Sequence, residues 1–308
     1  MSLTNWALLI TLSILWGGTF LLARIAVVEV PPLTLVFLRV ALAALTLHAV
    51  LRVRGLRFPL EPRLLGAFAV MGLLNNAIPF SLIFWGQTVL TASLASILNA
   101  TTPIFTVIVA AAIVAQEPLR GHRIAGIAVG FAGVVLLLLP GLRGLGVSPV
   151  WAQLLCLGGA LSYAFAATFA RRFRGVPVLV AAAGQLSASS LLVLPLAAWQ
   201  AATWQGTGWA VADTGAGVWL SVVALGTLCT ALAYLIYFRL LVEAGATNAS
   251  LVTLLIPVTA SVLGALTLGE SLTGPQLSGM AVLLVGLALL DGRILRWRRS
   301  SALAPGDD

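Results

Sequence analysis

Ten long apolar segments follow one another along the chain, and this repetition limits the possible folds more than any other feature of the sequence. Each is about long enough, as a helix, to cross a hydrocarbon layer of roughly 30 Å. Charged residues make up only 8% of the 308 residues and hydrophobic residues 60%, which excludes a soluble enzyme, a nucleic-acid-binding module and a disordered scaffold. The sequence therefore predicts an all-α polytopic membrane protein with ten transmembrane helices, near residues 5–27, 33–52, 64–87, 92–114, 123–140, 149–170, 177–198, 216–238, 247–268 and 275–293.

The basic residues indicate how these helices are oriented. All 17 are arginines, and the net charge is +8, but they lie between apolar segments and form no stripe beside exposed aromatic rings, so no nucleic-acid partner is expected. Placing both termini in the cytoplasm puts 14 of the 17 arginines in cytoplasmic segments, where such an excess is typical. We therefore expect a multi-pass protein of the inner (plasma) membrane with both termini cytoplasmic.

The second half of the sequence repeats the first. A shift of 154 positions places Gly72 on Gly226, Ser96 on Ser250 and Pro103 on Pro257. We predict two five-helix repeats, residues 1–145 and 146–295, followed by a cytoplasmic tail at 296–308. Because five is odd, the second repeat enters the membrane in the opposite sense, an inverted arrangement found in secondary transporters with a central substrate site. A duplicated bundle without a transport role is the alternative.

Several stretches resemble a known family. The segment from Ala246 to Leu290 is similar to the EamA-type repeat of the drug/metabolite transporter superfamily, as are its counterpart at 92–137, the opening from Ile14 to Ala26, and Arg39 in LVFLRVALAAL. Within this superfamily the chain most resembles amino-acid exporters of the YddG type. The resemblance implies a ten-helix transporter, with sugars, nucleotide precursors or drugs as alternative substrates.

Polar and aromatic residues in the middle of the spans are the candidates for a substrate cavity, because lipid-facing positions are expected to be apolar. An amide offers donors and acceptors without adding a buried charge. In the third span Asn76 and Phe80 are four residues apart, and in the fourth Asn99, Thr102 and Thr106 share a stripe. Hydrogen bonds between helices are the alternative role for each amide. The predicted substrate-binding residues are Trp16, Asn76, Phe80, Asn99, Thr102, Tyr163 and Tyr234.

Prolines inside the spans are candidates for hinges. A proline within a helix removes a backbone hydrogen bond and clashes with the preceding turn. Pro103 and Pro257 occupy equivalent positions in the two repeats. We predict hinge or gating roles for Pro79, Pro103 and Pro257, with a static kink as the alternative for each.

Glycines and glutamates at the span ends suggest structural roles. Small residues at four-residue spacing allow helices to approach closely, so we expect packing of the two halves through a set of glycines in spans five and ten. Glu117 and Glu270 precede spans five and ten, and each is expected to cap the helix that follows it. The glycines are Gly126, Gly130, Gly133, Gly279 and Gly286.

Acidic residues are missing from the interior of every span. A proton-coupled drug antiporter is expected to have such a carboxylate. Arg39 can pair with a substrate carboxylate, but a snorkelling or backbone-bonded role is favoured, and His48 is expected to be packed or interfacial. The cavity is thus predicted to be uncharged and suited to a zwitterion with an apolar side chain.

The resulting hypothesis is an exporter of small neutral and aromatic amino acids that works by alternating access. A drug or other metabolite exporter of the same superfamily is the alternative. An intramembrane enzyme is a remote one, because only two histidines and no G-x-S-x-G or H-E-x-x-H motif are present. Small molecules and the lipid bilayer are the expected partners, no cofactor or metal is expected, and the sequence is compatible with a monomer.

Overall fold

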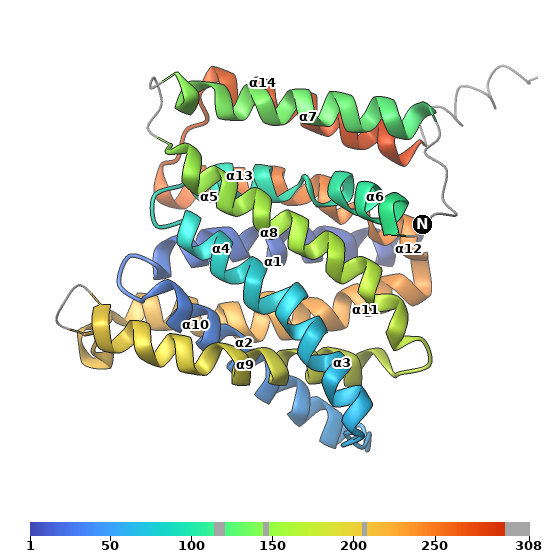
Figure 1. Ribbon diagram of the computed structural model, residues 1–308, viewed down its shortest axis with the longest axis vertical. Coiled ribbons are helices and arrows are strands. Elements are labelled where there is room, and N and C mark those ends of the chain that lie inside the picture. Colours follow the sequence, from blue (N-terminus) through green and yellow to red (C-terminus); the bar gives the residue numbers. More distant parts are fainter. Residues whose placement is uncertain (114–120, 144–147, 205–207, 293–308) are drawn as a thin grey trace, which may run out of the picture.

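The computed structural model describes residues 1–113, 121–143, 148–204 and 208–292. The predicted tail at 296–308 and Glu117 lie outside these residues, as does the predicted boundary between the repeats. Within them the regular elements are all helical (Figure 1). The α-helices are α1 (Leu3–Ala26), α2 (Pro32–Val53), α3 (Pro62–Gly72), α4 (Ile78–Gly86), α5 (Ala92–Asn99), α6 (Thr102–Ile113), α7 (Gly121–Leu142), α8 (Val150–Phe169), α9 (Val178–Thr203), α10 (Ala216–Gly226), α11 (Ala233–Ala244), α12 (Ala246–Ala249), α13 (Val252–Leu268) and α14 (Gly274–Asp291).

Shorter helical segments connect several of these helices. Two are π-helices, η1 (Leu73–Ala77) between α3 and α4 and η5 (Thr227–Leu232) between α10 and α11. Two are 3₁₀ turns, η2 (Ala170–Phe173) and η4 (Val211–Asp213).

The described residues contain nine helical segments long and apolar enough to cross a membrane, and α13 is a shorter apolar helix. The predicted all-helical membrane fold is confirmed. The third and eighth spans are continuous helical segments, 62–86 and 216–244, each with a π-helix near its middle. The eighth extends six residues beyond the end predicted at residue 238.

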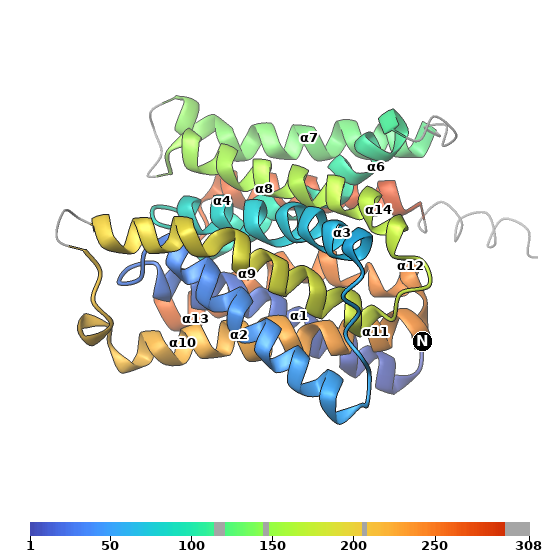
Figure 2. The same cartoon turned by 60° about the horizontal axis from the view of Figure 1, so that its bottom comes forward.

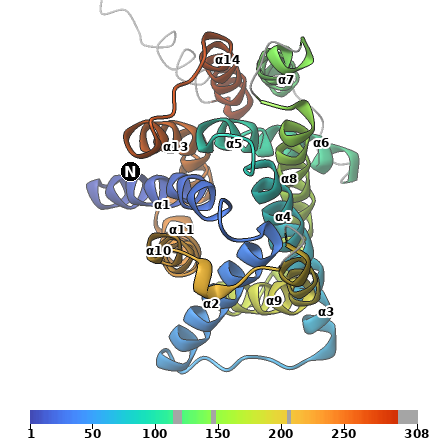
Figure 3. The same ribbon diagram turned by 90° about the vertical axis from the view of Figure 1, so that its left-hand side faces the viewer.

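Helices from both halves form a ring, and α7 and α14 lie outside it (Figure 3). Viewed from one end, α1, α13, α5, α8, α4, α9, α2 and α10 surround a common centre, whereas α7 and α14 form a separate pair (Figure 3). Opposite that pair, α2 packs against α9 (Figure 2). The packing repeats between the halves: α1 lies against α13 as α8 lies against α6, and α9 contacts α3 as α2 contacts α10.

Close glycine contacts hold α7 against α14. A Cβ atom added at Gly286 would collide with the backbone of Gly130, and one added at Gly133 would lie 2.7 Å from the backbone nitrogen of Leu283. At Gly126 an added Cβ would lie 2.6 Å from the backbone nitrogen of Leu290. The predicted packing of the two halves through these glycines is therefore confirmed.

The two π-helices begin at equivalent positions of the sequence repeat. Leu73 and Thr227, their first residues, are separated by the 154 positions that relate the two halves. Gly72 and Gly226 immediately precede them and meet neighbouring helices, since an added Cβ would lie 2.6 Å from the Gln185 carbonyl oxygen or the Leu42 side chain, respectively. Internal π segments often mark functional sites, and both of these contribute residues to an internal cavity.

Candidate functional site

A cavity of about 680 Å³ lies between the two halves. Its walls come from both of them and are rich in aromatic rings, with amide, hydroxyl and guanidinium groups among these rings. Polar groups of this kind are energetically unfavourable at lipid-facing surfaces, so their presence indicates an internal site. The lining includes Trp16, Phe20, Arg39, Asn75, Phe80, Phe84, Asn99, Thr102, Tyr163, Gln185, Cys229, Thr230, Tyr234, Tyr237 and Phe238.

Arg39 supplies a charged group to this cavity. Its side chain is only 5% exposed, and its Nε donates a 2.9 Å hydrogen bond to the Thr230 hydroxyl of the other half. The guanidinium carbon lies 3.8 Å from the ring centroid of Phe80, a cation–π contact. The prediction of an uncharged cavity is therefore wrong. The favoured snorkelling or backbone-bonded role is also wrong, because the arginine contacts a side chain of the opposite half and lines the cavity.

The third span places a different asparagine in the lining from the one that we predicted. Asn75 lines the cavity and its amide donates to the Gln185 side chain at 3.0 Å and to the Tyr234 hydroxyl at 3.3 Å. Asn76 has no exposed surface and donates to Ser189 at 3.0 Å. The prediction assumed four-residue spacing, whereas in the π-helix the hydrogen bonds run to i+5. Asn75 therefore shares the cavity face with Phe80.

The fourth span is broken where it meets the cavity. Helix α5 ends at Asn99 and α6 begins at Thr102, and the Thr102 hydroxyl donates to the Asn99 carbonyl oxygen at 2.7 Å. The Asn99 Oδ1 atom is buried and has no hydrogen-bond partner among the described residues. Both residues line the cavity, but Thr106 is absent from its lining. The break therefore leaves a buried acceptor without a partner at a residue of the cavity wall.

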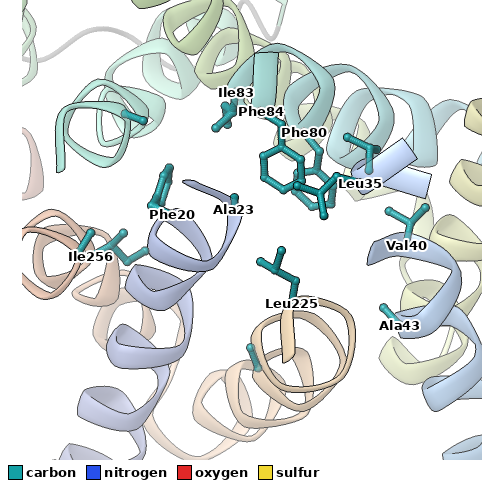
Figure 4. Packing of buried hydrophobic residues seen from close by; sticks show 14 of the residues in the cluster. Phe20, Ala23, Leu35, Val40, Ala43, Phe80, Ile83, Phe84, Leu225 and Ile256 are labelled. Atoms are coloured by element: carbon teal, nitrogen blue, oxygen red, sulfur yellow. The ribbon is translucent and has the colours of Figure 1, made fainter. Parts of the chain in front are cut away.

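The predicted aromatic residues meet in the cavity wall. The Trp16 and Tyr237 rings lie 5.2 Å apart, and Tyr163 stands edge-on to Phe80 at 6.5 Å. Tyr234 stacks at a tilt on Phe238, 5.8 Å away. Side chains that include Phe20, Ile83, Phe84 and Leu225 point into the space between the surrounding helices (Figure 4), and the first three of these line the cavity.

The prolines occupy unequal places in the two halves. Pro103 follows the α5–α6 break and lines the cavity. Pro257 lies inside α13, five residues after that helix begins at Val252. Pro79 is buried and is the second residue of α4, which directly follows the π-helix. Pro103 and Pro257 are equivalent in the sequence repeat, but the helices around them are not interrupted at equivalent positions. The hinge roles stay predictions.

Polar contacts link α1 and α4 beyond Phe20 and Phe84, which line the cavity. The Arg24 guanidinium donates to the carbonyl oxygens of Gln87 and Thr88, at 3.0 and 3.2 Å, and the Gln87 amide donates to the Phe20 carbonyl oxygen at 2.8 Å. Gln87 has no exposed surface. These bonds join the last two turns of α1 to the residues that follow α4.

Side chains from each half also cap helices of the other half at this end of the molecule. Glu270 accepts from the backbone N–H groups of Ala92 and Ser93, at 2.8 and 3.0 Å, and from the Ser93 hydroxyl at 2.6 Å. Glu29 accepts from the N–H of Gly215, at 2.7 Å. The Gln200 amide oxygen accepts from Leu33 at 2.7 Å. Helix N-termini favour such acceptors, because their first N–H groups have no partner within the helix.

The predicted role of Glu270 is therefore corrected. It caps α5 in the other half and does not cap the helix that follows it. That helix, α14, already has Thr273 as its N-cap, with a reciprocal hydrogen bond from the Thr273 N–H to the Gln276 side chain. The Glu270 carboxylate is therefore available to cap the N-terminus of α5.

The opposite end of the cavity reaches the protein surface. Its lining there includes Phe173, Val178 and Leu241, together with the exposed Arg174. His48 lies outside the lining and pairs with the Ser187 hydroxyl at 2.9 Å while packing edge-on against Phe58. The predicted packed role of His48 is confirmed.

Sequence reasoning missed several lining residues, namely Asn75, Gln185, Thr230 and Tyr237. The repeat offered a signal for two of them. The shift of 154 positions places Asn75 on Cys229 and Asn76 on Thr230. The asparagine pair in the first half therefore marked the equivalent pair in the second half as candidates for the cavity. Gln185 offered no periodic signal, since its role depends on which helix face meets Asn75.

Comparisons with known proteins support the same architecture. A model described as the EamA-like transporter family matches residues 4–139 and again residues 150–290. "Uncharacterized transporter YoaV" of Bacillus subtilis (strain 168) is 22% identical over 91% of this chain and 94% of its own. "Probable amino-acid metabolite efflux pump" of Escherichia coli (strain K12) is 28% identical over 97% and 98%, respectively. A solved crystal structure superimposes with a TM-score of 0.64 at 24% identity, covering 96% of this chain and 99% of the other.

Proposed function

Because the chain belongs to the EamA-like transporter family, we propose that it exports small neutral and aromatic amino acids by alternating access of its two halves. The observation that carries this proposal is the cavity of about 680 Å³ between the halves. Its volume falls within the range of about 300–1,000 Å³ that is typical of small-molecule sites. Aromatic rings suit an apolar side chain, and the polar groups among them suit the charged groups of an amino acid. The name of the Escherichia coli relative supports the same substrate class.

The direction of transport follows from the orientation. We take both termini to be cytoplasmic, because this orientation places most arginines in cytoplasmic segments. Arg171, Arg172 and Arg174 then lie at the cytoplasmic end, where the cavity reaches the surface. The contacts of Arg24, Glu29 and Glu270 lie at the outer end. Loading from the cytoplasm followed by release outside requires these outer contacts to break.

Counterflow in proteoliposomes tests the proposal. Liposomes preloaded with unlabelled phenylalanine, tryptophan, leucine or threonine should accumulate the same radiolabelled amino acid, whereas liposomes preloaded with a sugar or a cationic drug should accumulate none of these amino acids. Measurements with and without a pH gradient distinguish the alternative, since no acidic residue lines the described part of the cavity. Counterflow of a sugar or drug without any amino acid would reject the substrate class. It would leave the transporter architecture intact.

A further inference from the structure

The charge of Arg39 is unbalanced within the cavity. Arginine stays ionised in proteins, and burying a charge without a partner is costly. Its Nε is bonded to Thr230, and the guanidinium makes no other hydrogen bond to the described part of the chain. No Asp or Glu is present among the lining residues that the structure describes. The outer N–H groups of this guanidinium are therefore available to an anionic group of the ligand.

The position of the guanidinium is fixed by both halves. Phe80, from α4 of the first half, lies against its face, and Thr230, from η5 of the second half, holds its Nε. The Thr230 hydroxyl in turn donates to the Leu225 carbonyl oxygen at 2.7 Å. With its face and one edge occupied, the guanidinium keeps a planar pair of donors for a ligand, the geometry that binds a carboxylate in bidentate fashion.

A complementary acceptor comes from the break in the fourth span. The buried Asn99 Oδ1 atom has no partner among the described residues, and Asn99 lines the same cavity. A buried acceptor without a hydrogen bond costs free energy that a donor on a ligand recovers. An ammonium group has three donors and no acceptor, so it suits this oxygen. The wall thus holds one unused cationic donor and one unused neutral acceptor.

We propose that Arg39 binds the carboxylate of the transported molecule and that Asn99 accepts a hydrogen bond from its ammonium group. This proposal rests on the transport function proposed above and narrows its substrate class. A carboxylate is required, because of the two charged groups of an amino acid only the carboxylate can neutralise Arg39. The ammonium group binds only a neutral amide, so we expect it to contribute less to the affinity than the carboxylate does. Amines and cationic drugs that lack a carboxylate are rejected by the charge of Arg39.

Three compounds with the same phenyl ring test the proposal. Isothermal titration of purified protein with L-phenylalanine, 3-phenylpropionate and 2-phenylethylamine compares a zwitterion, an anion and a cation. The wild-type protein should bind phenylalanine most tightly, phenylpropionate next and phenylethylamine least. Arg39→Met should weaken both carboxylates about 10- to 100-fold, the range for hydrogen bonds to charged groups. Asn99→Leu should weaken phenylalanine but leave phenylpropionate unchanged.

Arg54→Met is the matched control. It removes an exposed arginine that does not line the cavity, so carboxylate binding should change by less than about threefold if the contact at Arg39 is specific. Arg39→Lys keeps the charge and should retain part of the carboxylate affinity. If Arg39→Met fails to yield monodisperse protein, the wild-type ranking and Arg39→Lys decide the outcome.

Several outcomes would overturn the assignment. They are equal binding of phenylethylamine and phenylpropionate by the wild-type protein, no binding of either carboxylate, or unchanged carboxylate affinity in Arg39→Met. Equal losses of both carboxylates in Asn99→Leu would remove Asn99 as the ammonium acceptor. Arg39-dependent binding of phenylpropionate without amino-acid counterflow would instead reject the proposed function and support the carboxylate site. The two proposals therefore fail separately.

Discussion

Trp16 shows how one side chain of the cavity wall is expected to affect transport. Its ring is half-buried, lines the cavity and lies 5.2 Å from the ring of Tyr237. Trp16→Ala should lower the apparent affinity for phenylalanine and tryptophan about tenfold or more, because burial of a large apolar side chain contributes roughly 1.5–3 kcal/mol. Concentration dependence of counterflow in proteoliposomes measures this effect.

The matched control for Trp16→Ala is Trp151→Ala. Trp151 lies in the first turn of α8, is 48% exposed and does not line the cavity. Counterflow should be unchanged in this variant. Equal effects of the two substitutions would mean that tryptophan removal acts through folding or membrane insertion, and Trp16 would then be removed from the site.

At the scale of single residues, the sequence indicated which residue types line the cavity but not which way each side chain faces. Asn75 and Asn76 are adjacent, and only the π-helix decides that Asn75 faces the cavity while Asn76 bonds to Ser189. Arg39 was recognised as ionisable within a span. Its position in the cavity involves a hydrogen bond to Thr230, 191 residues away, which no local pattern could connect to it.

The α7–α14 pair shows how helix packing limits substitution. A methyl group at Gly286 would collide with the backbone of Gly130, and backbone cannot move aside as a flexible side chain can. Gly286→Ala should therefore destabilise the protein by about 1–3 kcal/mol, the usual cost of overpacking. A lower unfolding temperature in detergent micelles would record this loss.

Gly66→Ala is the corresponding control in α3. Gly66 also lies within a helix, but an added Cβ would find no atom within 4 Å. Alanine is the better helix former by about 1 kcal/mol, so stability should stay the same or rise. A similar loss of stability in both variants would mean that glycine as such, and not the close approach of α7 and α14, determines the effect.

Helical elements were the part of the fold that the sequence predicted best. Apolar length and proline positions located the spans, because a membrane requires every backbone group to be bonded within a helix. The interruptions were harder to predict. Pro103 and Pro257 match in the repeat, yet α6 begins one residue before Pro103 while α13 begins five residues before Pro257. Packing against neighbouring helices therefore decides where each helix breaks.

For the whole molecule, the contacts of Glu270 are expected to control access from the outer end. Its carboxylate holds the N-terminus of α5 across the boundary between the halves. Glu270→Ala should weaken this closure and raise the fraction of molecules open to the outside. Cys229 is a native reporter, because it lines the cavity and is 3% exposed. Cys156→Ala makes it the single cysteine, since the chain has two.

A membrane-impermeant maleimide added from either side of oriented proteoliposomes measures this change. Labelling of Cys229 should be faster from the cytoplasmic side in the otherwise unaltered protein, and Glu270→Ala should increase labelling from the outer side several-fold. Glu243→Ala is the control, since its carboxylate forms an exposed ion pair with Arg239 at 2.7 Å. Faster outer labelling of the unaltered protein would contradict the orientation. An equal response to both substitutions would contradict the role of Glu270.

The sequence by itself determined the membrane environment, the helical architecture, the internal repeat and the close packing of the glycine helices. These follow from composition, segment length and residue spacing, which are local properties or simple repeats. The tertiary structure decided that Arg39 lines the cavity beside Thr230, that Asn75 takes the place predicted for Asn76, and that Glu270 caps α5. Each of these depends on which helix faces meet across the two halves, and that arrangement is set by the packing of the whole chain.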